Sequence, residues 1–238
     1  MASSSLRESE KSELIFKTAR VQARLISSGE LLSEELVQAH LEQIEKVNPA
    51  VNAMVTMVSE SALEQAREAD KARSRGDELG PLHGLPVAVK DLQDTAGILT
   101  THGSPIYENN VPENDALIVE RLKAAGAIVT GKSNTPEFGA GSQTFNAVFG
   151  TTKNPYDLSR TCGGSSGGAG VALATGMTTI ATGSDLGGSL RNPAAWSNVV
   201  GIRPAPGRVP AVGGDLGWSN LSTEGPMGRT VDDVAFQL

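Results

Sequence analysis

The 238-residue sequence has one cysteine, three histidines, few aromatic residues and no long apolar segment. A single cysteine, Cys162, excludes a disulfide within the chain and any cysteine-based zinc site. The histidines are scattered without ligand spacing and the carboxylates show no metal-binding pattern, so we expect no metal and no cofactor. No run approaches the length of about 18 apolar residues that a membrane-spanning helix needs, and the first residues lack an apolar signal core. These absences predict a cytoplasmic protein that does not bind membranes.

The sequence also has fewer basic than acidic residues. It contains 20 Lys and Arg against 27 Asp and Glu, which gives a net charge of −7 and a pI near 5.1. Nucleic-acid binding requires a basic face, so this balance argues against a nucleic-acid partner. Hydrophobic residues make up 39% and charged residues 20% of the chain. These fractions are typical of a globular domain.

Helical patterns dominate residues 1–80. One helix is predicted to start at an N-cap residue, Ser33, and to end before Pro49, with apolar residues along one face. His40 falls on this face, where a packed histidine is the expected interpretation. A second helix is predicted over about 60–75, ending at Gly76.

Short, apolar, β-branched runs appear from residue 81 onward and alternate with a helical pattern over about 115–125. The four runs cover residues 85–89, 127–130, 178–181 and 199–202. Strands that alternate with helices predict an α/β fold with a parallel or mixed sheet. Thr230 is predicted to cap a further helix. Because no linker interrupts the chain, we expect a single domain over 1–238, with 81–238 as its α/β core.

Two motifs match known patterns but lack the required context. Residues 126–133 fit the phosphate-loop pattern G-x-x-x-x-G-K-[ST], but their middle residues favour a strand where that pattern needs a loop. Residues 163–167 fit the G-x-S-x-G nucleophile elbow, which needs a histidine later in the chain. All three histidines precede Ser165, so this chain cannot complete such a triad.

Glycine is concentrated in the second half, where 19 of the 27 glycines follow Phe138. Eight of these lie in two segments, 163–170 and 183–188, around serines. Residues 161–170, which contain the first segment, are predicted to form a tight loop, because glycine is unfavourable in helices and strands. Gly187 and Gly188 precede Ser189 and would present N–H groups beside its hydroxyl, as an oxyanion hole requires. A serine nucleophile without histidine needs another base, and Lys90 after five apolar residues is a candidate, since burial lowers the pKa of lysine.

These segments resemble the amidase signature family, whose hydrolases use a Ser-Ser-Lys triad. The matching residues are 84–91, 131–139, 154–157, 163–168, 183–191 and 207–209. The resemblance extends from about residue 12 to Leu238 and implies the amidase signature fold, a mixed twisted sheet flanked by helices. The catalytic domain of that family is considerably longer. We therefore expect this chain to be an incomplete, N-terminal, triad-bearing half that is inactive without a C-terminal half or a second chain.

The resemblance also implies a role for each residue of the site. Ser189 would be the nucleophile, Ser165 the bridging serine on a cis peptide, and Lys90 the base. The backbone amides of the loop before and at the nucleophile would form the oxyanion hole, namely those of Leu186, Gly187, Gly188 and Ser189. Six further residues would shape the loops: Gly163, Gly164, Ser166, Gly167, Asp185 and Arg191.

The function implied by the resemblance is that of an amidase. Such a hydrolase cleaves the C–N bond of a linear carboxamide through a serine acyl-enzyme, with a small-molecule amide or carbamate as substrate. Three alternatives remain: a carbamate (urethane) or ester hydrolase, a non-catalytic fragment or scaffold, and a glutamine amidotransferase subunit. Pro206, before Gly207 and Arg208, is more typical of general amidases than of the amidotransferase, in which tyrosine is usual at this position.

Overall fold

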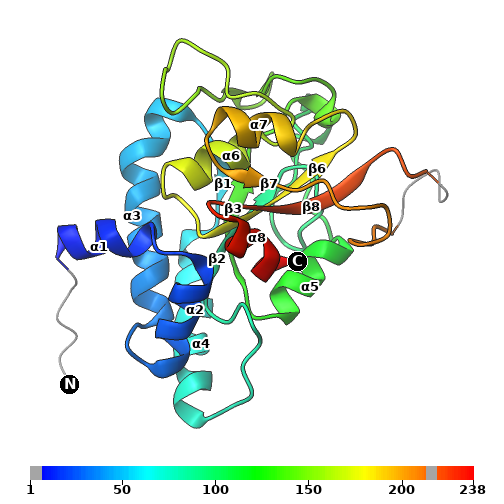
Figure 1. Cartoon of the computed structure of the whole chain (residues 1–238). Coiled ribbons are helices and arrows are strands. Elements are labelled where there is room, and N and C mark those ends of the chain that lie inside the picture. Colours follow the sequence, from blue (N-terminus) through cyan, green and yellow to red (C-terminus); the bar gives the residue numbers. More distant parts are fainter. Residues whose placement is uncertain (1–6, 213–218) are drawn as a thin grey trace.

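A six-stranded mixed sheet forms the centre of the computed structural model, which describes residues 7–212 and 219–238 (Figure 1). In spatial order its strands are β1 (Met54–Met57), β3 (Ile128–Ser133), β2 (Pro86–Lys90), β6 (Ile180–Asp185), β8 (Thr223–Gly228) and β7 (Val200–Gly201). Strand β2 runs parallel to β3 and β6, and the other three pairs are antiparallel. This arrangement confirms the α/β class and the mixed sheet. Strands β4 (Phe145–Asn146) and β5 (Gly150–Thr151) form a separate two-stranded sheet.

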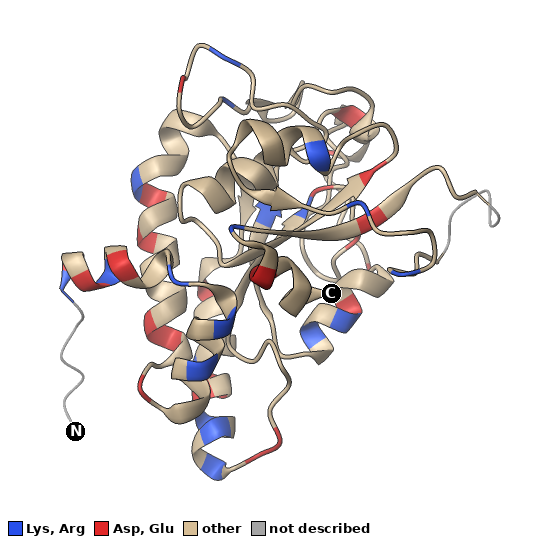
Figure 2. Cartoon of the chain, viewed as in Figure 1, with Lys and Arg blue, Asp and Glu red and all other residues tan. Residues whose placement is uncertain are grey.

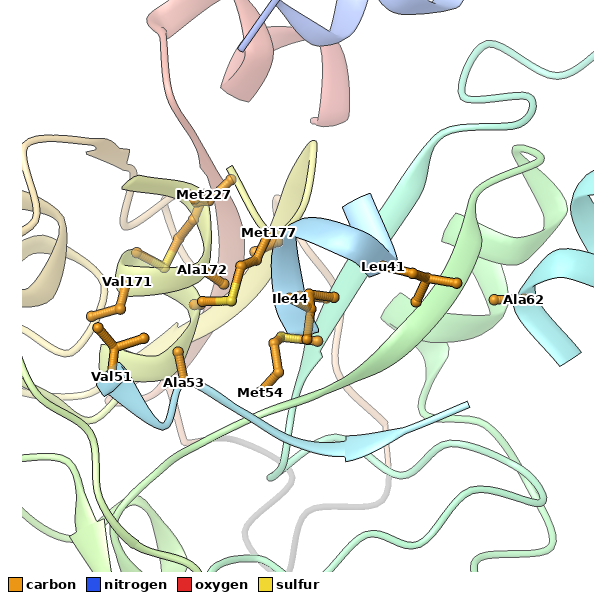
Figure 3. Close-up of a cluster of buried hydrophobic side chains, with 14 of the residues drawn as sticks. Leu41, Ile44, Val51, Ala53, Met54, Ala62, Val171, Ala172, Met177 and Met227 are labelled. Carbon is orange, nitrogen blue, oxygen red and sulfur yellow. The ribbon is translucent and has the colours of Figure 1, made fainter. Parts of the chain in front are cut away.

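Helices cover both faces of the sheet. Alternation along β2 directs Ala88 into one apolar cluster and Val87 and Val89 into the other. The first cluster packs against α3 (Ser33–Val51), α4 (Ser59–Arg75), α6 (Gly167–Ala174) and α7 (Arg191–Trp196) (Figure 3). The second packs against α1 (Glu8–Ile15), α2 (Ala19–Ser28), α5 (Leu117–Ala124) and α8 (Val231–Gln237). Two short 3₁₀ helices span Pro105–Tyr107 and Glu137–Gly139.

Most predicted elements lie at the expected positions in the chain. The four apolar runs correspond to β2, β3, β6 and β7. Helix α4 ends at Gly76, which adopts the left-handed conformation with φ of 78°. Helix α8 follows Thr230, whose hydroxyl accepts a hydrogen bond from the Asp233 N–H at 3.1 Å.

The predicted bounds of α3 were wrong at both ends. Leu32 is the N-cap residue and Ser33 is the first helical residue, because Asp70 accepts hydrogen bonds from the Ser33 and Glu34 N–H groups at 2.8 and 3.0 Å. Pro49 lies inside the helix, which continues to Val51. Proline removes only one N–H there, and the Asn52 N–H still closes the last turn on the Asn48 carbonyl at 2.7 Å.

Residues 1–80 are not wholly helical, since β1 belongs to the central sheet. This strand pairs antiparallel with β3 and forms one edge. Both basic and acidic residues lie along the outer helices in the view of Figure 2. No helix among residues 7–212 and 219–238 is both long and apolar enough to cross a membrane.

Candidate active site

Lys90 is the last residue of β2 and is completely buried. Its Nζ atom lies 2.7 Å from Ser165 Oγ, 2.9 Å from Ser166 Oγ and 3.0 Å from Ser184 Oγ. Burial lowers the pKa of Lys90 to about 7, although the nearby charges of Glu224 and Asp185 act in the opposite direction. A neutral amine keeps two N–H donors and gains a lone pair. It can therefore accept a hydrogen bond from one of these hydroxyls and donate to the other two.

Ser165 and Ser166 immediately precede α6, and the Gly164–Ser165 peptide is cis, as the resemblance predicted. The expectation of a loop across 161–170 was wrong from Gly167 onward, because tertiary packing overrides the low helix propensity of glycine. A Cβ atom at Gly168 would lie 2.3 Å from the Asn134 backbone nitrogen. The glycines therefore let α6 approach β3 closely enough to bring both serines to Lys90.

Ser189 lies in the loop between β6 and α7 and is partly exposed. Its carbonyl accepts a hydrogen bond from the Ser166 N–H at 3.2 Å, which joins the two serine segments. Its hydroxyl makes no hydrogen bond to the described part of the chain. The Ser189 hydroxyl is therefore available to a ligand.

Asp185 holds this loop in shape. Its carboxylate accepts hydrogen bonds from the Gly188 and Leu190 N–H groups at 2.8 and 3.1 Å, and two from Arg191 at 3.0 Å. Burial by itself would raise the pKa of Asp185, but these hydrogen bonds hold it well below its usual range. Asp185 thus joins Arg191 to the backbone of this loop.

The predicted oxyanion amides are not all available. The Gly188 N–H donates to Asp185. In the part of the chain that the structure describes, the N–H groups of Leu186, Gly187 and Ser189 have no hydrogen-bond partner. A Cβ atom at Gly187 would meet nothing within 4 Å, so the space beside this amide is open. Three of the four predicted amides are therefore without a hydrogen-bond partner in the described part of the chain.

The remaining loop-shaping glycines lie against neighbouring loops. The Gly163 carbonyl accepts a hydrogen bond from Thr144 Oγ1 at 2.8 Å, and a Cβ atom at Gly167 would lie 2.1 Å from that oxygen. At Gly164 a Cβ atom would lie 3.0 Å from the Gln143 backbone. Close packing thus explains the need for glycine at these positions.

Sequence reasoning missed Ser184, which contacts Lys90 Nζ, and Thr182, whose hydroxyl accepts the Lys90 N–H at 2.9 Å. The two-residue alternation of β6 places both side chains on one face of the strand. That alternation was a usable signal, because the run 178–181 continues directly into the 183–191 motif.

The rejected motifs have structural roles. Residues 128–133 of the phosphate-loop pattern form β3, and Lys132 is buried with Nζ bonded to the Gln93 carbonyl and to Thr95 Oγ1. His40 is buried and bonded to the Gly176 carbonyl at 2.9 Å and to Thr179 Oγ1 at 3.1 Å. Among the residues with described positions, no group of three or more His, Cys, Asp or Glu could hold a metal ion.

The structure thus combines a mixed α/β sheet with a buried lysine whose amine contacts three serine hydroxyls. The Amidase family matches residues 35–238. The chain is 46% identical over 226 residues to a glutamyl-tRNA(Gln) amidotransferase subunit of Carboxydothermus hydrogenoformans, covering 95% of this chain and 47% of that protein. The corresponding protein of Streptomyces coelicolor is 45% identical, with 94% of this chain and 45% of that protein covered.

Solved structures show the same likeness. Fatty acid amide hydrolase superposes with a TM-score of 0.91 at 30% identity, covering 98% of this chain and 42% of that one. A bacterial aryl acylamidase superposes with a TM-score of 0.89 at 32% identity, covering 93% and 46%. The chain belongs to the amidase signature family, and it spans about half the length of the curated relatives that it matches.

Proposed function

We propose that this site cleaves carboxamide C–N bonds through an acyl-enzyme formed on Ser189. The observation that supports the proposal most is the buried Lys90 amine, 2.7 Å from Ser165 Oγ, in a member of a family of amide hydrolases. A lysine whose pKa lies near 7 is a competent base at neutral pH. The site therefore needs no histidine.

The proposed reaction begins with proton transfer. Neutral Lys90 accepts the Ser165 hydroxyl proton while Ser165 takes the Ser189 proton. Ser189 Oγ then attacks the carbonyl carbon, and the free loop amides stabilise the oxyanion. The relay returns the proton to the leaving nitrogen as the C–N bond breaks. A water molecule, deprotonated by the same relay, attacks the acyl carbon. The relay returns this proton to Ser189 Oγ as the ester bond breaks, and the acid leaves as its carboxylate.

The relatives favour a narrower role than that of a free linear-amide hydrolase. Identities of 44–48% to glutamyl-tRNA(Gln) amidotransferase subunits, over about nine-tenths or more of this chain, support the amidotransferase alternative over the primary expectation. In that role the site would cleave the C–N bond of the carboxamide of glutamine and release ammonia. The tripeptide 206–208 favours a general amidase, but it covers only three residues. The identity to the amidotransferase subunits extends over most of the chain and outweighs it.

We further propose that additional polypeptide completes the acyl pocket, either in the same chain or in a second one. Leu186, beside the proposed nucleophile, is 66% exposed, and the relatives are about twice as long as this chain. Covering this open loop would remove bulk water from around the developing oxyanion and strengthen its interaction with the loop amides. Completion of the pocket would also decide between glutamine and other acyl groups.

The test is a substrate panel on the full-length protein, with L-glutamine, an aryl acylamide, a carbamate and an ester. Ser189→Ala should abolish turnover and the mass shift of the acyl-enzyme. Ser27→Ala is the matched control, because this exposed hydroxyl bonds only the Arg24 carbonyl. Preference for glutamine would support the amidotransferase role, whereas preference for another substrate would support a hydrolase. Unchanged turnover in Ser189→Ala would overturn the proposed chemistry.

A further inference from the structure

A carboxylate on β8 lies near Lys90 and has no ion-pair partner among residues 7–212 and 219–238. Glu224 is directly opposite Ser184 in the β6–β8 register, and Ser184 Oγ lies 3.0 Å from Lys90 Nζ. Directly opposed residues of an antiparallel pair project from the same face of the sheet. Glu224 therefore shares a face with a hydroxyl that contacts the lysine amine.

Gln93 is hydrogen-bonded to the backbone of Lys90 and also influences the Glu224 carboxyl. It is 2% exposed, and its N–H donates to the Lys90 carbonyl at 3.0 Å. The Thr182 hydroxyl donates to Gln93 Oε1 and accepts the Lys90 N–H. With Oε1 occupied, Nε2 is a buried donor without a hydrogen-bond partner in the described part of the chain. Burial raises the pKa of the Glu224 carboxyl, and the nearby Gln93 side chain and the positive charge of Lys90 partly oppose that rise.

The other charged groups around Lys90 are offset by partners. On β6, the Asp185 carboxylate binds Arg191 at 3.0 Å and Arg203 at 3.3 Å. Asp91, the next residue after Lys90, accepts the Thr101 hydroxyl at 2.6 Å and is stabilised as an anion by Lys132 of β3. None of the ion pairs in the described segments includes Glu224. Its charge therefore acts on Lys90 without a compensating cation.

We propose that Glu224 is a positioning residue that sets how readily Lys90 loses its proton, and with it the pH range in which the site operates. This inference rests on the proposed function, which makes Lys90 the base. An ionised Glu224 favours the ammonium form of Lys90. Removal of the Glu224 charge would let the amine become neutral at a lower pH.

The test compares pH profiles of kcat/KM for the full-length protein and its variants, using the best amide of the substrate panel. In Glu224→Gln the acidic limb should move to lower pH by about 0.5–1 unit, the range of a nearby partly screened charge. Glu224→Asp, which retracts the carboxylate, should move the limb in the same direction by less. Glu120→Gln removes the same charge from an exposed position on α5 and should leave the limb unchanged.

A limb that stays at the wild-type pH in Glu224→Gln would overturn the inference, even if the rate falls, because a purely structural role alters amplitude alone. If Glu224→Gln does not fold, Glu224→Asp decides on the same criterion. Ser189→Ala is measured in parallel. If Ser189→Ala still turns over substrate, the proposed function is overturned. If Ser189→Ala is inactive but the acidic limb of the kcat/KM profile does not move in Glu224→Gln, only the role of Glu224 is overturned.

Discussion

At the level of a single residue, Lys90 is both buried and ionisable, and burial normally disfavours a charged side chain. A fully buried ammonium is costly, and the protein avoids this cost by lowering the lysine pKa to about 7. Three serine hydroxyls within 3.0 Å replace the water that the amine loses. Near neutral pH both protonation states are therefore populated, which is the condition under which a base transfers protons most effectively.

The activity should accordingly rise with pH through about 7. Only deprotonated Lys90 can accept the Ser165 proton, so kcat/KM should increase through the pKa of Lys90 and level off above it. Lys90→Met should lower turnover by several orders of magnitude, as does removal of one member of a cooperative unit. Lys46→Met, at an exposed position on α3, is the control. Activity that is flat or falls between pH 6 and 8 would contradict this assignment.

At the level of elements, sequence reasoning succeeded where local pattern and fold agree. The apolar runs of β2, β3 and β6 are strands that the sheet buries on both faces, and their composition signals this directly. Helix α6 and strand β8 have no such signal, because glycines and Pro226 disfavour the structures that they adopt. Pairing with β6 and packing against β3 determine these elements, and neither is visible along the chain.

The same distinction applies to the site. Lys90, Ser165 and Ser189 lie in motifs with a recognisable spacing, so the resemblance could name them as candidates. Ser184 could have been found from the alternation of β6, but Glu224 comes close to it only through the register of β6 and β8, which depends on contacts between distant segments. A register shift by one residue would direct Glu224 to the opposite face. Sequence alone therefore could not assign it.

A substitution at Gly168 tests whether the close packing of α6 contributes to the stability of the protein. A Cβ atom there would lie 2.3 Å from the Asn134 backbone nitrogen and 2.7 Å from the Ala53 carbonyl oxygen, and backbone atoms cannot move aside cheaply. Gly168→Ala should therefore lower the free energy of unfolding by about 2 kcal/mol or more. Gly187→Ala, which meets nothing within 4 Å, should leave it nearly unchanged. Urea denaturation measures both, and equal stability of the two variants would contradict the packing argument.

At the scale of the whole molecule, segments from the two ends of the chain lie side by side. Helices α2 and α8 pack together although they are far apart in sequence (Figure 1). The Arg229 guanidinium donates to the Lys17 carbonyl at 3.0 Å and to the Thr178 carbonyl at 2.7 Å. These contacts fix the N-terminal segment to the chain beside β6 and β8. The stability of this part of the sheet therefore depends on residues far apart in the sequence.

Two adjacent aspartates on α8 contact the N-terminal helices, one through buried hydrogen bonds and the other through an exposed ion pair. Asp233 is fully buried and accepts the Ala19 N–H at 2.6 Å and the Thr230 N–H at 2.9 Å. Asp233→Ala would leave both donors without an acceptor and should lower the free energy of unfolding by about 2–3 kcal/mol. Asp232 forms an ion pair with Arg20 in which the side chains are 50% and 54% exposed. Exposed pairs contribute little, so Asp232→Ala should change stability by less than about 0.5 kcal/mol. Equal losses in urea denaturation would show that the buried carboxylate does not join the two ends, since both variants remove one negative charge from the same turn of α8.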